Sequence, residues 1–163
     1  MNSVKADFFY RKPLKKGESK PNFGLSEPDP QRPDHKSFER EVINARSKAT
    51  SFKREGFKLL NHKSSVEDFY DDQSVASAYY LEMQELAKKE SSADEVFIVS
   101  HITRNELEAQ KGKRLGAHRL VHNDFTPNFS QTLKPIIENT TFTPSKISVF
   151  NLWRRFDEDG LDA

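Results

Sequence analysis

The feature that most constrains the fold of this chain is one long helical stripe near its middle. From Asp72 onward, apolar residues recur at steps of three and four positions until about Lys89. This spacing places them on one face of an amphipathic helix. The stripe consists of Val75, Ala78, Tyr79, Met83, Leu86 and Ala87. We therefore predict a helix over 72–89, whose tyrosines and methionine serve either as plain core or as part of a ligand pocket.

Segments on both sides of this stripe have the patterns of β-strands. Residues 96–99 form a continuous apolar run, which is typical of a strand buried on both faces. Residues 147–153 alternate between two sets of side chains, which is the periodicity of a strand. Further strands are predicted at 8–10, 41–46, 56–61 and 119–126, and a short helical turn at 132–138 despite Pro135. Strands, one long helix and then more strands indicate an α+β fold.

The first 36 residues differ in character from the rest. Prolines and glycines recur through residues 11–36, which predicts an extended or irregular loop. Basic residues exceed acidic ones near the start: Lys5, Arg11, Lys12, Lys15, Lys16 and Lys20 face Asp7 and Glu18. This excess indicates either a basic arm that contacts phosphate or a solvated leader. We predict an extended arm over 1–36 and a single domain over 37–163.

Composition limits the possible functions. Of the 163 residues, 34% are hydrophobic and 11% aromatic, which is enough for a modest core. The absence of cysteine excludes disulfides, thiolate zinc sites and a cysteine nucleophile. With 26 basic and 25 acidic residues, no global charge favours nucleic acid or an anionic membrane. The sequence has no apolar run of membrane-spanning length, no signal-type segment and no glycine-rich phosphate loop, so we expect a cytoplasmic protein.

The best candidate for a chemical site lies in the predicted strand 119–126. Residues two apart on a strand point to the same face, so His122 and Asp124 project together. An imidazole beside a carboxylate suits a ferrous ion in a 2-His-1-carboxylate site. By spacing alone, a surface ion pair or hydrogen bond explains the pair better than a metal site, because chance predicts about one such pair at this composition. His101, after the predicted strand 96–99, could face the same cavity, although no spacing rule places it there.

Several segments, read in order, resemble one known family. They are GFKLLNHKSSVEDFYDDQSVASAYYLEMQEL, ADEVFIVSHITRNE, HRLVHNDFTP and ISVFNLWRRF, within roughly residues 38–155. This ordered set resembles the hydroxylase/desaturase family typified by AsaB, which includes CmcJ/NvfI-type proteins and gibberellin desaturase-like enzymes of fungi and bacteria. The matching positions are Gly56, Phe57, His62, Ser64, Asp68, Phe69, Tyr80, Glu82, His101, Arg104, the run from His122 to Thr126 and the run from Asn151 to Arg154. The order of these elements, rather than any single one, carries the resemblance.

The resemblance implies a partial double-stranded β-helix, of the jelly-roll or cupin-like kind, with one long flanking helix. It also implies Fe(II) and 2-oxoglutarate as cofactors, and hydroxylation or desaturation of a small molecule such as a secondary metabolite. In this scheme His122 and Asp124 hold the iron, and no residue is assigned as an acid–base catalyst.

The resemblance further gives candidate substrate-binding residues. Arg104 and Arg154 are candidates for carboxylate recognition, because a guanidinium binds a carboxylate through two parallel hydrogen bonds. Ordinary surface ion pairs are the alternative for both arginines. Asn151 and Trp153 would line the pocket from the strand that they share with Arg154.

The sequence also departs from the family pattern. Family members continue beyond the N-x-W-R strand into a segment with a second iron-binding histidine and a 2-oxoglutarate-binding arginine. Here no histidine follows His122, and Arg155 stands where the family has proline. We therefore expect a truncated relative whose unpaired strand edges favour a homodimer. Two functions stay open: an oxidoreductase that acts on a small molecule, and a catalytically inactive relative that acts as a binding or interaction module.

Overall fold

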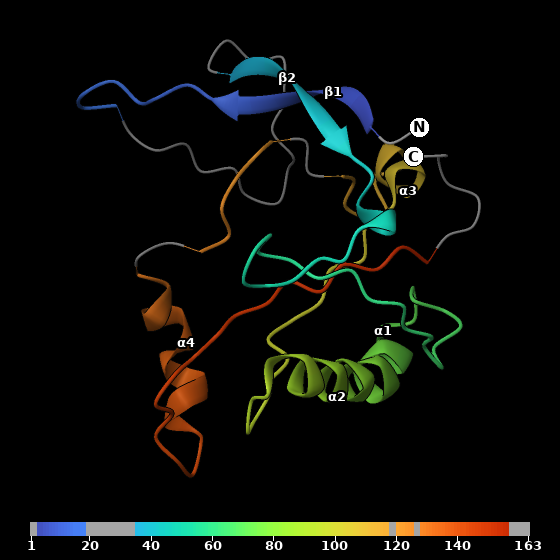
Figure 1. The fold of residues 1–163 in the computed structure, drawn as a ribbon, viewed down its shortest axis with the longest axis vertical. Helices are drawn as coiled ribbons and strands as arrows, with labels where there is room; N and C mark the ends of the chain where they lie inside the picture. The colour runs from blue at the N-terminus through green and yellow to red at the C-terminus, as the bar shows by residue number, and fades with distance from the viewer. Residues whose placement is uncertain (1–2, 19–34, 118–119, 126–127, 157–163) are drawn as a thin grey trace. The chain divides into compact units, whose positions relative to one another are not determined.

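The fold was analysed in a computed structural model of the chain (Figure 1). The structure describes residues 3–18, 35–117, 120–125 and 128–156. The chain divides into two compact units, one made of residues 1–62 and 103–123 and the other of residues 63–102 and 124–163. The described residues form several helices and a two-stranded sheet, so the predicted α+β class is confirmed.

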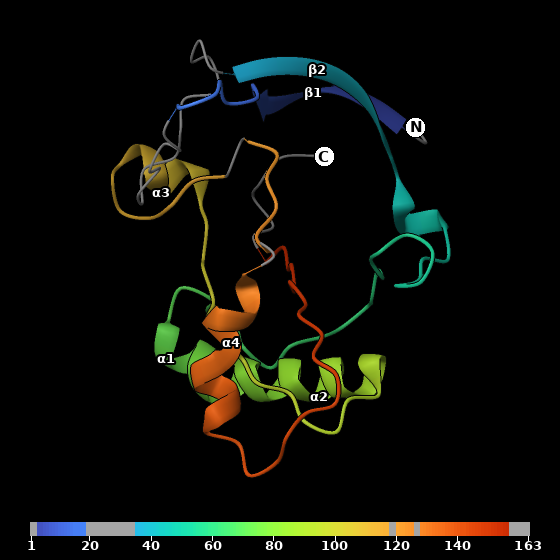
Figure 2. The same cartoon turned by 90° about the vertical axis from the view of Figure 1, so that its left-hand side faces the viewer.

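The sheet of the first unit is an antiparallel ribbon of two strands, β1 (Ser3–Arg11) and β2 (His35–Ile43) (Figures 1 and 2). Phe8 lies opposite Phe38 in the register. Side chains opposite each other in such a pair project from the same face of the ribbon. The predicted strand at 8–10 is therefore confirmed, and it is longer than the sequence indicated.

A third segment runs beside β1. Leu120 forms a parallel bridge with Phe9, and the backbone N–H of Val121 donates to the Phe9 carbonyl at 2.9 Å. The Leu120 side chain is buried. Because an isolated two-stranded ribbon is only marginally stable in water, this contact adds stability to the hairpin. It also fixes the start of the segment that leads into His122.

Short helices in the first unit begin at asparagine caps. The 3-10 turn η1 (Ala45–Ser47) follows Asn44, whose side chain accepts the backbone N–H of Arg46. Helix α3 (Glu106–Gln110) follows Asn105, whose side chain likewise accepts a backbone N–H of the first turn. An asparagine at this position satisfies a donor that the helix itself leaves unpaired.

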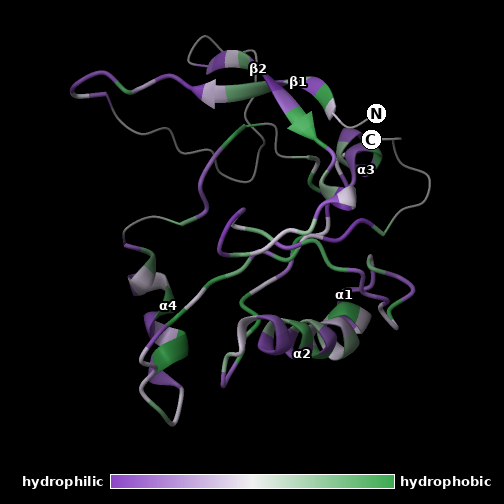
Figure 3. Cartoon of the chain, in the orientation of Figure 1, coloured by the Kyte–Doolittle hydropathy of each residue, from purple (hydrophilic) through white to green (hydrophobic). Residues whose placement is uncertain are grey.

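The helix predicted over 72–89 is present in the second unit. It consists of α1 (Asp72–Ser74), the π-helical segment η2 (Val75–Tyr79) and α2 (Tyr80–Ser91), which follow one another without a break (Figures 1 and 2). Asp71 caps its start, and hydrogen bonds from the Ser74 hydroxyl and nearby backbone N–H groups lower the pKa of this carboxyl. Val75 of η2 and Met83 of α2 are buried, whereas α2 ends in a hydrophilic run at 88–91 (Figure 3).

Polar side chains of α2 hold two extended segments of the second unit. The Glu82 carboxylate accepts hydrogen bonds from the Ser64 hydroxyl at 2.6 Å and from the Ser65 N–H and hydroxyl at 2.7 and 2.6 Å. The Gln84 amide donates to the carbonyl of Val96 at 3.0 Å. Because a carboxylate makes stronger hydrogen bonds than a neutral acceptor, Glu82 is the stronger of these anchors.

Helix α4 (Phe129–Glu138) confirms the helical turn predicted at 132–138 and contains Pro135. The rings of Phe125 and Phe129 lie 4.8 Å apart at its start. None of the helices in the described part of the chain has the length and apolar character needed to cross a membrane.

Three of the predicted strands are absent. Residues 56–61, 96–99 and 147–153, all of which the structure describes, form no strand. Phe97 and Val99 are 50% and 61% exposed, so the apolar run is not buried on both faces. The prediction failed because alternation and apolarity describe only one segment, whereas a strand needs a second backbone to supply its hydrogen bonds.

Two further strand predictions are confirmed only in part. The strand predicted at 41–46 belongs to β2, which starts earlier and ends at Ile43. Of residues 120–125, only Leu120 makes a bridge, and positions 119 and 126 of the predicted strand lie outside the described residues, as does the proline-rich stretch 19–34. The one described sheet has two strands, so the double-stranded β-helix stays a prediction.

Replacing Glu82 with alanine should lower the free energy of unfolding by about 2 kcal/mol, because hydrogen bonds to a charged group contribute roughly 1.5–3 kcal/mol. Urea unfolding followed by far-UV circular dichroism measures this loss. Glu85 is an exposed residue of the same helix and provides the matched control. Its alanine variant should stay within about 0.5 kcal/mol of the parent, and equal losses in both variants would contradict the anchoring role.

Candidate functional site

The ring of His122 is oriented by its own backbone. Its Nδ1 lies 2.7 Å from the carbonyl oxygen of Leu120. A carbonyl only accepts hydrogen bonds, so Nδ1 carries the proton and Nε2 carries the lone pair of the neutral ring. Histidines that bind metals commonly donate their other N–H to a backbone carbonyl in this way. Leu120 is held beside β1 by its bridge with Phe9, so the carbonyl that orients the His122 ring is itself fixed in position.

The carboxylate of Asp124 is oriented by a side chain far away in the sequence. The amide nitrogen of Asn151 donates to Asp124 Oδ2 at 2.6 Å, within the second unit. The resemblance predicts that Asn151 lines a substrate pocket, and the structure brings its amide against the predicted metal ligand Asp124. A hydrogen bond of this kind holds a ligating carboxylate in position without removing its charge.

The two halves of the predicted metal pair fall in different units of the chain. His122 belongs to the first unit and Asp124 to the second, so their convergence on one cation stays a prediction. Among the residues that the structure describes, no group of three or more histidine and acidic side chains is arranged to hold a metal ion. These residues therefore supply no complete 2-His-1-carboxylate set.

Arg104 closes the loop around α3. Its Nη1 donates to the Gly116 carbonyl at 2.6 Å, and its backbone forms a parallel bridge with Leu115. The loop packs closely at Gly116, because an added Cβ would lie 2.8 Å from Glu106 Oε2 and 3.2 Å from the Ala109 Cβ, and both neighbours would have to shift. One nitrogen of this guanidinium therefore has a structural role. Fewer of its N–H groups are left to form two parallel hydrogen bonds with a carboxylate.

Arg154 is held in an aromatic cluster on η2. Its Nε donates to the Tyr79 hydroxyl at 3.1 Å, and its guanidinium lies 5.5 and 5.8 Å from the ring centroids of Tyr79 and Phe69. The ring of Phe156 stacks on Phe69 at 4.9 Å. A cation over aromatic faces is stabilised by their quadrupoles. The neighbouring Trp153, predicted to line the pocket, is 87% exposed.

Sequence reasoning missed a relay of polar side chains in the second unit. The Tyr80 hydroxyl lies 2.8 Å from His101 Nδ1, and His101 Nε2 lies 3.3 Å from Asp72 Oδ1. When the ring proton of His101 is on Nε2 and faces Asp72, Nδ1 accepts a hydrogen bond from the Tyr80 hydroxyl. The carboxylate and the imidazole then act together on that hydroxyl. Tyr80 and His101 both stand among the motif positions quoted above, but spacing gave no reason to join them.

A double-mutant cycle tests this relay. Tyr80→Phe and His101→Ala should each lower the free energy of unfolding by about 1 kcal/mol, and the double variant should lose less than the sum, because both changes remove one hydrogen bond. Unfolding in urea gives the coupling energy. Tyr80→Phe combined with Lys5→Ala, a change in the other unit, should be additive. Additivity in both cycles would show that the Tyr80–His101 hydrogen bond contributes nothing.

Known proteins support one family for this chain. A family model described as an oxidoreductase/YMDC permease-like domain matches residues 8–159. The alpha-ketoglutarate-dependent dioxygenase phiK of a fungal species is 34% identical over 92 residues, covering 53% of this chain and 33% of the relative. The alpha-ketoglutarate-dependent dioxygenase tstK of Talaromyces stipitatus is 39% identical over 80 residues, covering 44% of this chain and 29% of the relative.

The chain spans about a third of the length of these two curated relatives. No solved structure matches it. Alpha-ketoglutarate is another name for 2-oxoglutarate, so the relatives confirm the resemblance to iron- and 2-oxoglutarate-dependent oxygenases of the AsaB type. Because the family model matches nearly the whole chain, the protein belongs to the oxidoreductase/YMDC permease-like domain family.

Proposed function

We propose that this chain carries part of the iron site of a 2-oxoglutarate-dependent oxidoreductase that hydroxylates or desaturates a small molecule, such as a secondary metabolite. The observation that carries this proposal is the pair of dioxygenase relatives within a matched oxidoreductase family. The orientation of the His122 ring by the Leu120 carbonyl is the structural support, because it directs the lone pair of Nε2 away from the backbone contact.

The donor types of His122 and Asp124 fit a ferrous ion. His122 supplies a neutral imidazole nitrogen and Asp124 a carboxylate, which are the ligand types of non-heme iron(II) sites. Asn151 acts on Asp124 as a positioning residue, because its amide fixes one carboxylate oxygen. Iron and 2-oxoglutarate, when bound, would together activate dioxygen, the oxidant needed to attack an unactivated C–H bond.

Arg154 is the better candidate for holding a carboxylate of the cofactor or substrate. Its hydrogen bond to Tyr79 uses Nε and its ring contacts fix the plane of the guanidinium, so little side-chain freedom is lost on binding. Arg104 already directs Nη1 at a backbone carbonyl. Trp153, largely exposed beside Arg154, offers a flat apolar surface for a substrate.

The second candidate function is that of an inactive relative acting as a binding module. The observation that favours it is the incomplete ligand set among the described residues, since two protein ligands hold iron only weakly. Anaerobic titration of the chain with Fe(II) and 2-oxoglutarate separates the two functions. A weak visible charge-transfer band marks the chelate that the oxidoreductase requires, and its absence supports the module.

In that titration, His122→Ala and Asp124→Ala should each abolish iron binding and leave the far-UV circular dichroism spectrum unchanged, because each change removes one of two ligands. His62→Ala changes a histidine that we do not assign to the metal, and it should bind iron like the parent chain. Parental iron affinity in either ligand variant refutes the assignment.

Asn151→Leu should weaken iron affinity by roughly 10–100-fold, the range found when an outer partner of a metal ligand is removed. Metal analysis after equilibrium dialysis measures the change. Trp153→Leu, two positions along the same segment, should leave iron affinity unaltered because the indole has no assigned contact with a ligand. An Asn151 variant with parental affinity would show that the contact with Asp124 is incidental.

A further inference from the structure

The hairpin of the first unit carries the acidic side chains of its two strands on only one of its two faces. The β1–β2 register places one set of side chains together, which we call the basic face: Val4, Ala6, Phe8, Tyr10, Lys36, Phe38, Arg40 and Val42. The acidic residues of the two strands, Asp7, Glu39 and Glu41, lie on the opposite face. There they have partners: Lys5 pairs with Glu39 at 2.8 Å, and the Ser37 hydroxyl donates to Asp7 at 3.1 Å.

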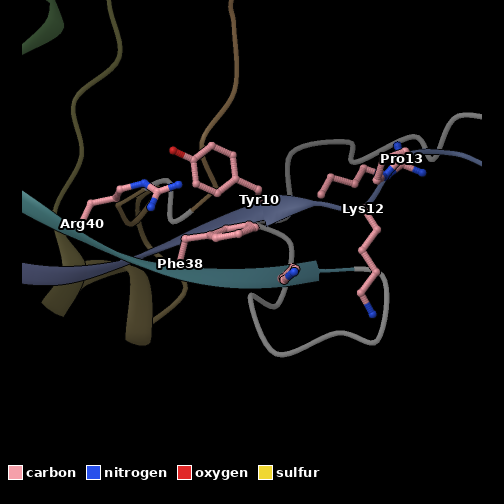
Figure 4. Close-up of a pocket in the computed structure, with 7 residues that line it drawn as sticks. Tyr10, Lys12, Pro13, Phe38 and Arg40 are labelled. Carbon is pink, nitrogen blue, oxygen red and sulfur yellow. The ribbon is translucent and has the colours of Figure 1, made fainter.

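Two cations and two rings gather at one end of the basic face. The Tyr10 and Phe38 rings meet edge to face, with centroids 5.6 Å apart. Lys36 Nζ lies 4.8 Å and the Arg40 guanidinium 5.1 Å from the Phe38 centroid. Figure 4 shows Arg40 reaching along the strand on the side of the Tyr10 ring.

These side chains border an open hollow. Its volume is about 460 Å³, and it is lined by Tyr10, Arg11, Lys12, Pro13, Lys36, Phe38 and Arg40 (Figure 4). Small-molecule sites occupy roughly 300–1,000 Å³, so the hollow has the size of a small-ligand site. Among the described residues, the lining contains no acidic side chain. A negatively charged ligand would therefore meet cations, and none of the described carboxylates lines the hollow with them.

We propose that this hollow binds a planar aromatic anion, that is, a small ring compound carrying a phosphate or carboxylate group. The anionic group would lie near Lys36 and Arg40, whose cationic heads lie 4.8 and 5.1 Å from the Phe38 centroid, and charge-assisted hydrogen bonds would hold it. The ring would pack against Tyr10 and Phe38. This proposal does not involve the iron site, and it stands or falls separately from the proposed oxidoreductase.

The same observations favour a small ligand over a nucleic acid strand. Binding a strand requires a positive groove that follows the backbone of the nucleic acid over several nucleotides. On the basic face the cations end at Arg40, beyond which the register places Val4 and Val42. Beyond Arg40 the face therefore offers no further cation for a strand to follow, whereas the cations of the hollow suffice for one or two anionic groups.

Calorimetric titration of the full chain tests the proposal with two probes, adenosine monophosphate for the phosphate class and naphthalene-2-carboxylate for the carboxylate class. We expect saturable binding of at least one probe, and the stronger probe identifies the anionic group. Adenosine and inorganic phosphate, which each lack one half of the ligand, should bind about tenfold more weakly or not at all, since each lost contact of this kind costs roughly a factor of ten.

Exposed variants connect this binding to the basic face. Lys36→Gln and Arg40→Gln should each weaken binding of the better probe by about tenfold. Lys5→Gln removes the same charge from the opposite face and should have no effect. Circular dichroism of each variant confirms that the hairpin persists, as expected for changes at exposed positions.

Three results would overturn the proposal. The first is no saturable binding of either probe. The second is equal loss of affinity in the Lys5, Lys36 and Arg40 variants, which would indicate a general charge effect. The third is tighter binding of a ten-residue oligothymidylate than of adenosine monophosphate, which would assign the face to nucleic acid.

Discussion

The second unit depends on the side chains that one helix directs at the extended segments around it. Within η2 and the first turns of α2, Tyr79 receives the guanidinium of Arg154 and Tyr80 meets His101. Glu82 takes the hydrogen bonds of residues 64–65, and Gln84 donates to the backbone at Val96. Three segments that are distant from one another in sequence, at residues 64–65, 96–101 and 154, are therefore tied to less than two turns of helix. Few apolar side chains are buried among the described residues of this unit, so these polar contacts determine the path of the extended segments.

This arrangement also explains what the family motif positions do. Ser64, Tyr80, Glu82, His101 and Arg154 are all among the positions that carried the resemblance, and all five take part in these anchoring contacts. These five motif positions therefore help to build the unit, whereas His122 and Asp124 are the motif positions proposed as metal ligands.

The parts of the fold that could be predicted are those that depend on local periodicity. The helix over 72–89 could be predicted because its apolar residues recur at three- and four-residue steps, which is the spacing of one helical face. A helical turn at 132–138 was predicted as well, and it lies within α4. The strand predictions at 96–99 and 147–153 were wrong because their patterns carry no information about a partner backbone.

Within the site, the residue types of His122 and Asp124 could be recognised directly from the sequence. The hydrogen bond from Asn151 could not, because 27 positions separate it from Asp124. The basic face could not be predicted either, because its residues are also distant in sequence. Only the strand register brings Lys36 opposite Tyr10 and places Arg40 on the same face.

The central claim is that His122 and Asp124 face one cation, and its location can be measured directly. Manganese(II) accepts the same nitrogen and carboxylate donors as iron(II), is stable in air, and broadens nuclear magnetic resonances of nearby groups. Titrated into the isotopically labelled chain, it should first broaden the resonances of His122, Asp124 and Asn151. Broadening that centres instead on Asp7, Glu39 and Glu41 of the hairpin, or that spreads evenly over the acidic residues, would contradict the claim.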